Sequence, residues 1–142
     1  MSGDQLATGI LTERAPKPAG HYAQAVVSGG AHVFVSGQLP IRPDGRPLDD
    51  DGFEAQARQA IQNMLEVVRA AGSSPQQLVK VTAYIVGIDN WARFNTVYAS
   101  MLPDARPARS VVPVPELHHG YLVEVDAIAA RAPGRGTETD PA

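Results

Sequence analysis

Residues 78–102, LVKVTAYIVGIDNWARFNTVYASML, contain the two periodicities that decide the fold. The first part is rich in β-branched residues and predicts a strand over Leu78–Val86. This strand is largely apolar on both faces, so we expect it to lie inside a sheet. One face would carry Val79, Val81, Ala83 and Ile85, and the other Leu78, Thr82, Tyr84 and Val86.

A helix is expected directly after this strand, over residues 90–102. Asp89 can cap its start, and Pro103 ends it because proline cannot continue a helix. Steps of three and four residues separate the apolar side chains that we expect this helix to bury. These side chains are Trp91, Phe94, Tyr98 and Met101.

A longer helix precedes the strand, in the segment 51–72 with the sequence DGFEAQARQAIQNMLEVVRAAG. Gly72 suits the C-terminal cap of this helix, and Pro75 blocks its continuation. The apolar residues share one face because they recur at helical spacing. The expected buried face consists of Phe53, Ala57, Ile61, Met64, Val68 and Ala71.

Short apolar runs predict four further strands. Tyr22–Val27 and His32–Ser36 flank the turn sequence Ser28-Gly29-Gly30 and are expected to form a hairpin. Ala108–Val114 and Leu122–Ala130 are expected to be the last two strands. This order predicts an α+β domain, in which two helices cover one face of a sheet of about six strands.

The 142 residues, of which 44% are hydrophobic, are enough for one domain with one core. Residues 1–14 and 132–142 are polar, so we expect a flexible N-terminal segment and a disordered C-terminal tail around a folded domain over 15–131. Because the two helices cover only one face of the sheet, the other face is expected to be buried by self-association. The number of subunits does not follow from this argument.

Composition argues against several classes of function. The absence of cysteine excludes disulfides, thiolate nucleophiles and zinc–cysteine sites. The histidines at 21, 32, 118 and 119 lack the spacing of a metal-binding motif, so no metal is expected. A net charge of −3 without a dense basic run argues against nucleic acid as a partner. Without a long apolar run or a secretion signal, the protein is expected to be cytoplasmic and to make no membrane contact.

The most informative polar residues lie in the last two strands. In RPARS, Arg109 has Val111 and Pro113 on its face of the strand, and an arginine among apolar neighbours needs an anionic partner. In LVEVDAIAA, Glu124 and Asp126 share one face, which is costly unless the carboxylates are paired or used. Periodicity alone favours a cross-strand ion pair of Arg109 with Glu124 or Asp126. A functional site is the alternative.

Three other polar residues are weaker candidates for a site. Ser36 ends a strand in VSGQ, Asn95 lies beside the apolar stripe of the second helix, and Tyr22 opens the first strand. Taken alone, each of them has a structural role as its favoured interpretation.

Together these segments resemble the family of reactive-intermediate deaminases (RidA, or YjgF-like), from about Ala15 to about Arg131. The specific part of the resemblance is the PARS block followed by the acidic strand of the VEVDAIA type. The matching blocks are AP followed by GHY within 15–22, VSGQLP at 35–40, QARQAIQNMLEVVRAAG at 56–72, VKVTAYIVGIDNWARFNTVY at 79–98, RPARS at 106–110 and LVEVDAIA at 122–129.

The resemblance implies a chorismate-mutase-like α+β fold with a mixed sheet, assembled as a homotrimer with clefts between subunits. It also implies that Arg109 binds a substrate carboxylate and that Glu124 positions or activates water. The other pocket residues that the family pattern implies are Tyr22, Ser36, Asn95 and Val111.

Two departures from the family pattern bear on the shape of the pocket. His21 replaces the usual proline of GPY, and Val111 stands where some members have cysteine. These two departures put substrate preference in question rather than activity. His118 and His119 also depart from the pattern, since they replace the usual Leu-Pro entry to the last strand.

The implied activity is hydrolysis of 2-aminoacrylate-type enamines and their 2-imino acid tautomers to 2-keto acids and ammonia. No metal, nucleotide or other cofactor is required, because an imine carbon is already electrophilic and needs only orientation and a basic group that holds water. Three alternatives stay open: a pathway-specific enzyme acting on a larger enamine, a non-catalytic trimer that binds small acids, and RNA cleavage. The negative net charge counts against the last of these.

Overall fold

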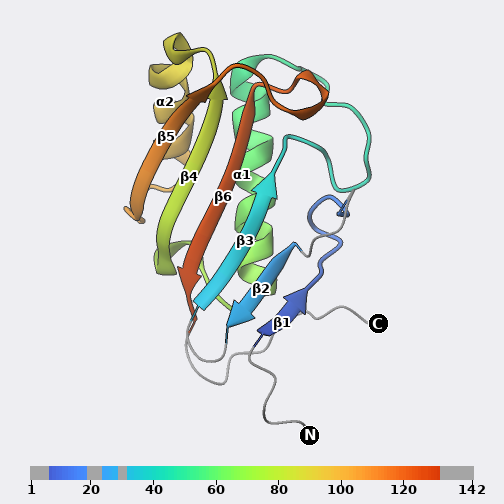
Figure 1. Ribbon diagram of the computed structural model, residues 1–142, viewed down its shortest axis with the longest axis vertical. Helices are drawn as coiled ribbons and strands as arrows, with labels where there is room; N and C mark the ends of the chain where they lie inside the picture. Colours follow the sequence, from blue (N-terminus) through green and yellow to red (C-terminus); the bar gives the residue numbers. More distant parts are fainter. Residues whose placement is uncertain (1–6, 19–23, 29–31, 132–142) are drawn as a thin grey trace, which may run out of the picture.

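The structure, a computed structural model, describes residues 7–18, 24–28 and 32–131. Within these residues, six strands form one sheet in the order β1-β2-β3-β6-β4-β5, and two helices cover one of its faces (Figure 1). The strands are β1 (Ala7–Ile10), β2 (Ala25–Ser28), β3 (His32–Gln38), β4 (Leu78–Val86), β5 (Ala108–Val114) and β6 (Val123–Ala130). The helices are α1 (Phe53–Ala70) and α2 (Trp91–Met101), and short 3-10 turns are η1 (Pro75–Gln77), η2 (Ile88–Asn90) and η3 (His118–Gly120).

The sheet is mixed, because β4 and β5 run parallel while the other neighbouring strands run antiparallel. The parallel pair needs a crossover, and α2 provides it. Although β6 follows β5 along the chain, it does not pair with β5 but lies between β3 and β4. The last strand is therefore central, and β5 forms an edge of the sheet.

Helix α1 confirms the prediction from its periodicity. All six residues of the expected face are buried, as the helix packs against β3, β6 and α2. Gly72 has a φ of 84°, a left-handed conformation that glycine adopts without a Cβ clash. The amides of Gly72 and Ser73 donate to the carbonyls of Arg69 (3.0 Å) and Val68 (3.1 Å), which closes the helix as a Schellman motif.

Helix α2 agrees with its expected bounds within a residue, but not all of its stripe is buried. Phe94 and Tyr98 are buried, and so is Val97, which the expected stripe omits. Trp91 remains 41% exposed, so its expected burial is wrong. The reason is its place as the first residue of α2, where its ring contacts the guanidinium of Arg109 instead of the core.

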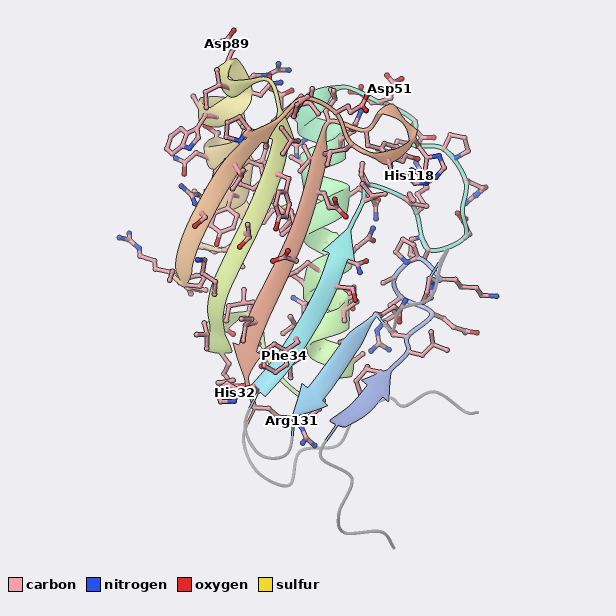
Figure 2. All side chains as sticks on the ribbon, viewed as in Figure 1. His32, Phe34, Asp51, Asp89, His118 and Arg131 are labelled. Atoms are coloured by element: carbon pink, nitrogen blue, oxygen red, sulfur yellow. The ribbon has the colours of Figure 1, made fainter. Side chains whose placement is uncertain are left out.

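Two local predictions about residues 78–90 are also wrong. The register of β4 on β6 shifts between Leu78 and Lys80, so Leu78 is buried and Val79 is 47% exposed, the reverse of strict alternation. Asp89 does not cap α2, because Asn90 occupies that position without a side-chain capping bond. Figure 2 shows Asp89 pointing outward from the molecule.

The predicted flexible segment over residues 1–14 is corrected for residues 7–14. Strand β1 pairs antiparallel with β2, and Ile10 is only 1% exposed. A short strand at a sheet edge needs few apolar residues, which is why composition alone suggested flexibility. Residues 1–6, Tyr22, the glycines at 29 and 30, and the tail 132–142 lie outside the described residues.

The two faces of the sheet differ in their surroundings. The helix-covered face holds the apolar core, whereas no described helix covers the other face, from which Figure 2 views the molecule. On this uncovered face Phe34 is 44% exposed and Val112 is 37% exposed. Neither described helix combines the length and apolar character that crossing a membrane requires.

Candidate active site

A cleft of about 540 Å³ lies where the segments after β1, β3 and β5 meet. Its lining comes from distant parts of the chain, because β6 pairs with β3 and places the Glu124 carboxylate beside the end of β3. Its lining includes Lys17, Ser36, Gly37, His118, His119 and Glu124.

A β-bulge in β3 makes room for the carboxylate in this cleft. The register of β3 on β6 shifts between Val35 and Gln38, so that Ser36 and Gly37 together oppose a single residue of β6. A Cβ atom on Gly37 would collide with the carboxylate of Glu124. The missing side chain at position 37 therefore gives the Glu124 carboxylate its place.

Glu124 is half-buried and chemically distinct from its neighbour on the same face. Burial raises the pKa of the Glu124 carboxyl, the charge of Asp126 raises it further, and His118 acts in the opposite direction. Asp126 accepts a hydrogen bond of 3.1 Å from the Tyr84 hydroxyl, whereas Glu124 has no hydrogen-bond partner in the described part of the chain. A carboxylate of this kind is suited to accept a proton.

Two buried amides hold the walls of the cleft in place. The side chain of Asn63 donates hydrogen bonds to the carbonyls of Leu39 (3.0 Å) and Ile41 (2.8 Å), which fixes the segment after β3 to α1. The side chain of Gln24 donates to the carbonyl of Pro16 at 2.7 Å. Because both amides are buried and bonded, the walls are pre-formed rather than shaped by a ligand.

Arg109 lies away from this cleft, against α2. Its Nη1 donates a hydrogen bond of 2.9 Å to Oδ1 of Asn95. Its Cζ atom lies 4.8 Å from the ring centroid of Tyr98 and 5.5 Å from that of Trp91. These three residues of α2 are spaced at helical intervals, so they present one face to the guanidinium. No carboxylate pairs with Arg109 among the residues described.

The Tyr98 hydroxyl beside this guanidinium is buried and has no hydrogen-bond partner in the described part of the chain. Burial raises the pKa of Tyr98, and the charge of Arg109 acts against that shift. A buried polar group without a partner is uncommon and often marks a functional site. Arg109 and the three residues of α2 around it, Trp91, Asn95 and Tyr98, are called the Arg109 cluster below. In this cluster the Arg109 guanidinium and the Tyr98 hydroxyl can each form further hydrogen bonds.

Arg109 and Glu124 lie on opposite faces of the sheet. Arg109 pairs with the fully buried Val81 on the helix-covered face, and Glu124 pairs with Tyr84 on the uncovered face. In addition, β4 separates β5 from β6. The expected cross-strand ion pair of Arg109 with Glu124 or Asp126 is therefore wrong within one chain.

The comparison with known proteins agrees with this architecture. Residues 12–131 match the protein family described as endoribonuclease L-PSP. The chain belongs to this family, the RidA (YjgF) family. A RutC family protein of Pyrococcus horikoshii is 38% identical over 120 residues, which are 84% of this chain and 94% of that protein.

Solved structures of the RidA family have the same fold. The YjgF gene product from E. coli matches with a TM-score of 0.78 and 35% identity, over 87% of this chain and 98% of that one. E. coli TdcF with bound serine matches with a TM-score of 0.79 and 36% identity, over 87% of this chain and 98% of that one. The family resemblance and the α+β fold expected from the sequence are thus confirmed.

In this RidA domain the predicted site residues fall into two groups. Ser36 lies with Glu124 in the cleft, whereas Asn95 and Val111 lie with Arg109 on the helix-covered face. Within the described ranges, no group of three or more histidine, aspartate or glutamate side chains is arranged to hold a metal ion.

Sequence reasoning missed two residues of these groups. Gly37 stands within VSGQ, and the signal that could identify it is that a glycine inside a strand often marks a bulge or a close approach. For Trp91, helical spacing predicts a place in the core, and no local signal distinguishes a core tryptophan from one that contacts an arginine.

Proposed function

We propose that this RidA family member hydrolyses 2-imino acids and their enamine tautomers to 2-keto acids and ammonia, in a site formed between two copies of the chain. The separation of Arg109 and Glu124 on opposite faces of the sheet carries this proposal. A half-buried cation and a half-buried carboxylate are each costly without a partner. A substrate between the arginine of one copy and the glutamate of the next would satisfy both.

The Arg109 cluster favours a substrate with a carboxylate. The bond to Asn95 uses one nitrogen of the guanidinium and orients the planar fork, which leaves other N–H groups free to hold a carboxylate in a bidentate manner. TdcF, a solved structure of similar fold, has serine bound, and serine carries a carboxylate of the required kind. We therefore assign substrate binding to Arg109 and Asn95, with Val111 beside them.

Glu124 supplies the base that the hydrolysis needs. Its carboxylate accepts a proton from water as the oxygen adds to the imine carbon, and the carboxyl then passes this proton to the nitrogen, which gives a neutral carbinolamine. The hydroxyl proton of the carbinolamine next moves to the amino group, the C–N bond breaks to release ammonia, and the carbonyl forms. Both protons of water thus end on the nitrogen, so the steps balance without a metal, nucleotide or redox partner.

Assembly into a homotrimer would supply the second copy. The uncovered face of the sheet bears exposed apolar side chains, including Phe34 and Val112, and such a face favours self-association. Cyclic assembly of three copies would give three equivalent interfaces, each able to combine one Arg109 with one Glu124. Ser36, which lines the Glu124 cleft, would meet the substrate at these interfaces.

RNA cleavage is the activity that the family description names. The net charge of −3 argues against a large phosphate-binding surface on this chain, since RNA binding depends on basic residues. We therefore favour a small acidic substrate over RNA.

The direct test is a coupled assay in which a pyridoxal-phosphate lyase generates 2-aminoacrylate and keto-acid release is followed with and without this protein. The wild-type protein should accelerate release over the uncatalysed rate. Glu124→Gln should lower the rate by roughly 10²- to 10⁴-fold with little change in Tm. Asp126→Asn is the control on the same face, and we expect a much milder effect because Asp126 is bonded to Tyr84.

Mixing two inactive variants tests whether the site is shared. Arg109→Ala and Glu124→Gln subunits, refolded together in equal amounts, should regain activity, because about one quarter of the interfaces would then combine two intact residues. A mixture as inactive as its components would contradict a shared site. A wild-type protein that does not accelerate keto-acid release would contradict the activity itself.

A further inference from the structure

The turn η3 places two histidines on the rim of the Glu124 cleft. His118 and His119 both line this cleft, as does the Glu124 side chain. Figure 2 shows His118 at the end of the molecule where the segment after β5 passes close to the segment after β3. The two histidines therefore share this cleft with Glu124.

The backbone of η3 fixes where these rings lie. His119 has a φ of 61°, in the left-handed region that residues with a side chain adopt at some cost, and Gly120 follows with a φ of 75°. The amide of Gly120 donates to the carbonyl of Leu117 at 3.1 Å, and that of Tyr121 donates to the carbonyl of His118 at 3.3 Å. The turn is thus closed by two hydrogen bonds.

The two rings support one another. The ring centroids of His118 and His119 lie 3.7 Å apart, and the His119 ring meets the edge of the Tyr121 ring at 6.1 Å. A ring in contact with another ring has fewer orientations than a free one. His118 is exposed, but this contact restricts its ring to the rim of the cleft.

The groups around Glu124 make His118 a distinctive neighbour. Asp126 lies two residues from Glu124 on the same face of β6 and adds negative charge there. Tyr84, which pairs with Glu124 from β4, adds a polar hydroxyl to this face. Lys17 lines the cleft from the segment after β1. Among these groups, histidine is the one that can both hold and release a proton near neutral pH.

We propose that His118 is a second proton-transfer group of this site, which donates a proton to the departing amine while Glu124 accepts the proton from water. The proposal rests on the imine hydrolysis proposed above. In the carbinolamine, a proton from His118 converts the amino group to an ammonium, and the C–N bond breaks to release ammonia. As the carbonyl forms, the hydroxyl proton returns to His118. Glu124 has by then passed the proton taken from water to the imine nitrogen, so both groups regain their starting protonation state. This division of roles follows general acid–base catalysis with two groups.

The test compares His118→Gln with His119→Asn in the keto-acid assay across pH. Asparagine suits the left-handed backbone at position 119, so this variant removes the ring that contacts His118 without straining the turn. We expect His118→Gln to lower kcat/KM on the order of 100-fold at neutral pH, with an unchanged Tm. Because the donor must be protonated, wild-type activity should fall as the pH rises, and His118→Gln should lose this alkaline limb. His119→Asn keeps the donor but removes the ring that restrains it, so it should lower kcat/KM less than His118→Gln and retain the limb.

A second readout does not depend on turnover. Because His118 lowers the pKa of the Glu124 carboxyl, that pKa, followed by NMR titration, should rise in His118→Gln. A His118→Gln variant with wild-type rate and the same alkaline limb would overturn the role of His118, and so would loss of the alkaline limb in His119→Asn. If the wild-type protein itself does not turn over the imine, the proposed hydrolysis fails first, and the two failures are thus distinguished.

Discussion

At the scale of single residues, the position of the Glu124 carboxylate depends on the absence of a side chain at Gly37. Gly37 is not among the described glycines with a positive φ, so its backbone conformation is open to other residues. Its role is the space that it leaves beside Glu124, within the bulge of β3. The requirement for glycine at position 37 is therefore steric and does not come from backbone conformation.

Gly37→Ala should therefore fold but displace the carboxylate. The added Cβ atom would meet the far end of a flexible side chain, which can move away at little cost in stability. We expect kcat/KM to fall about 10-fold or more, because a small displacement of a catalytic group is costly, while Tm changes little. In a Glu124→Gln background, Gly37→Ala should lower kcat/KM hardly any further, because both substitutions act on the side chain at position 124. Additive losses would show that Gly37 acts by another route.

Arg109 is the other decisive residue, and its planar shape is the property to test. Arg109→Lys keeps the charge but loses the fork that Asn95 orients, and it also loses the flat contact with Tyr98. We expect a loss in kcat/KM of roughly 10- to 150-fold, as for one charge-assisted contact. Arg106→Lys, an exposed change in the same segment, is the matched control and should be neutral. Wild-type kinetics in Arg109→Lys would contradict the carboxylate role.

At the scale of elements, an exposed ion pair connects α2 to α1. Glu54, in the first turn of α1, accepts bonds from Nε (2.9 Å) and Nη2 (2.6 Å) of Arg93. Arg93 also donates to Asn90 at 2.8 Å. Since α2 supplies the residues that surround Arg109, this pair contributes to the geometry of the site as well as to helix packing.

This pair predicts a specific loss of stability in acid. The hydrogen bond from Arg93 lowers the pKa of Glu54 from 4.5 to about 2. A depressed folded-state pKa means that the stabilisation is complete above the unfolded value of 4.5 and is lost as the pH falls through about 2. Tm measured across this range should decline less in Glu54→Gln than in the wild type. The effect should be small and should shrink in high salt, because both side chains are exposed. Identical pH profiles would show that the pair contributes nothing.

At the scale of the whole molecule, one sheet face is covered and the other is not. Phe34 and Val112 are large apolar residues exposed on the uncovered face, and Glu124 lies on the same face. If this face is buried by other copies of the chain, assembly and activity have a common cause. A single copy would contain both charged groups but no way to bring them together.

Val112→Asp should therefore lower both the mass of the assembly in solution and the catalytic rate. The wild type is expected to sediment at three times the 15.0 kDa of the chain, and a charge on the buried face of the assembly should shift it toward monomer. The control is Ile88→Asp, since Ile88 is 58% exposed but lies in η2, away from this face. A wild-type monomer at micromolar concentration, or a Val112→Asp trimer with full activity, would contradict the shared site.

Local sequence patterns are enough to predict most of the helices and strands and the buried side of most of them. Helical spacing identified the buried face of α1, alternation identified Glu124 and Asp126 as neighbours on one face of β6, and Gly72 marked the end of α1. These features depend on residues close together in the chain, so local periodicity is enough to predict them. The PARS and VEVDAIA blocks likewise identified the family, because each block is a short run of consecutive residues.

Which elements become neighbours depends on the tertiary fold and not on local sequence patterns. The insertion of β6 between β3 and β4 separates Arg109 from Glu124, and the parallel register of β5 turns Arg109 toward α2. The bulge at Ser36 and Gly37 then opens the cleft beside Glu124. Periodicity cannot predict these arrangements, because it records the face of each residue within its own strand but not the order or direction of the strands around it.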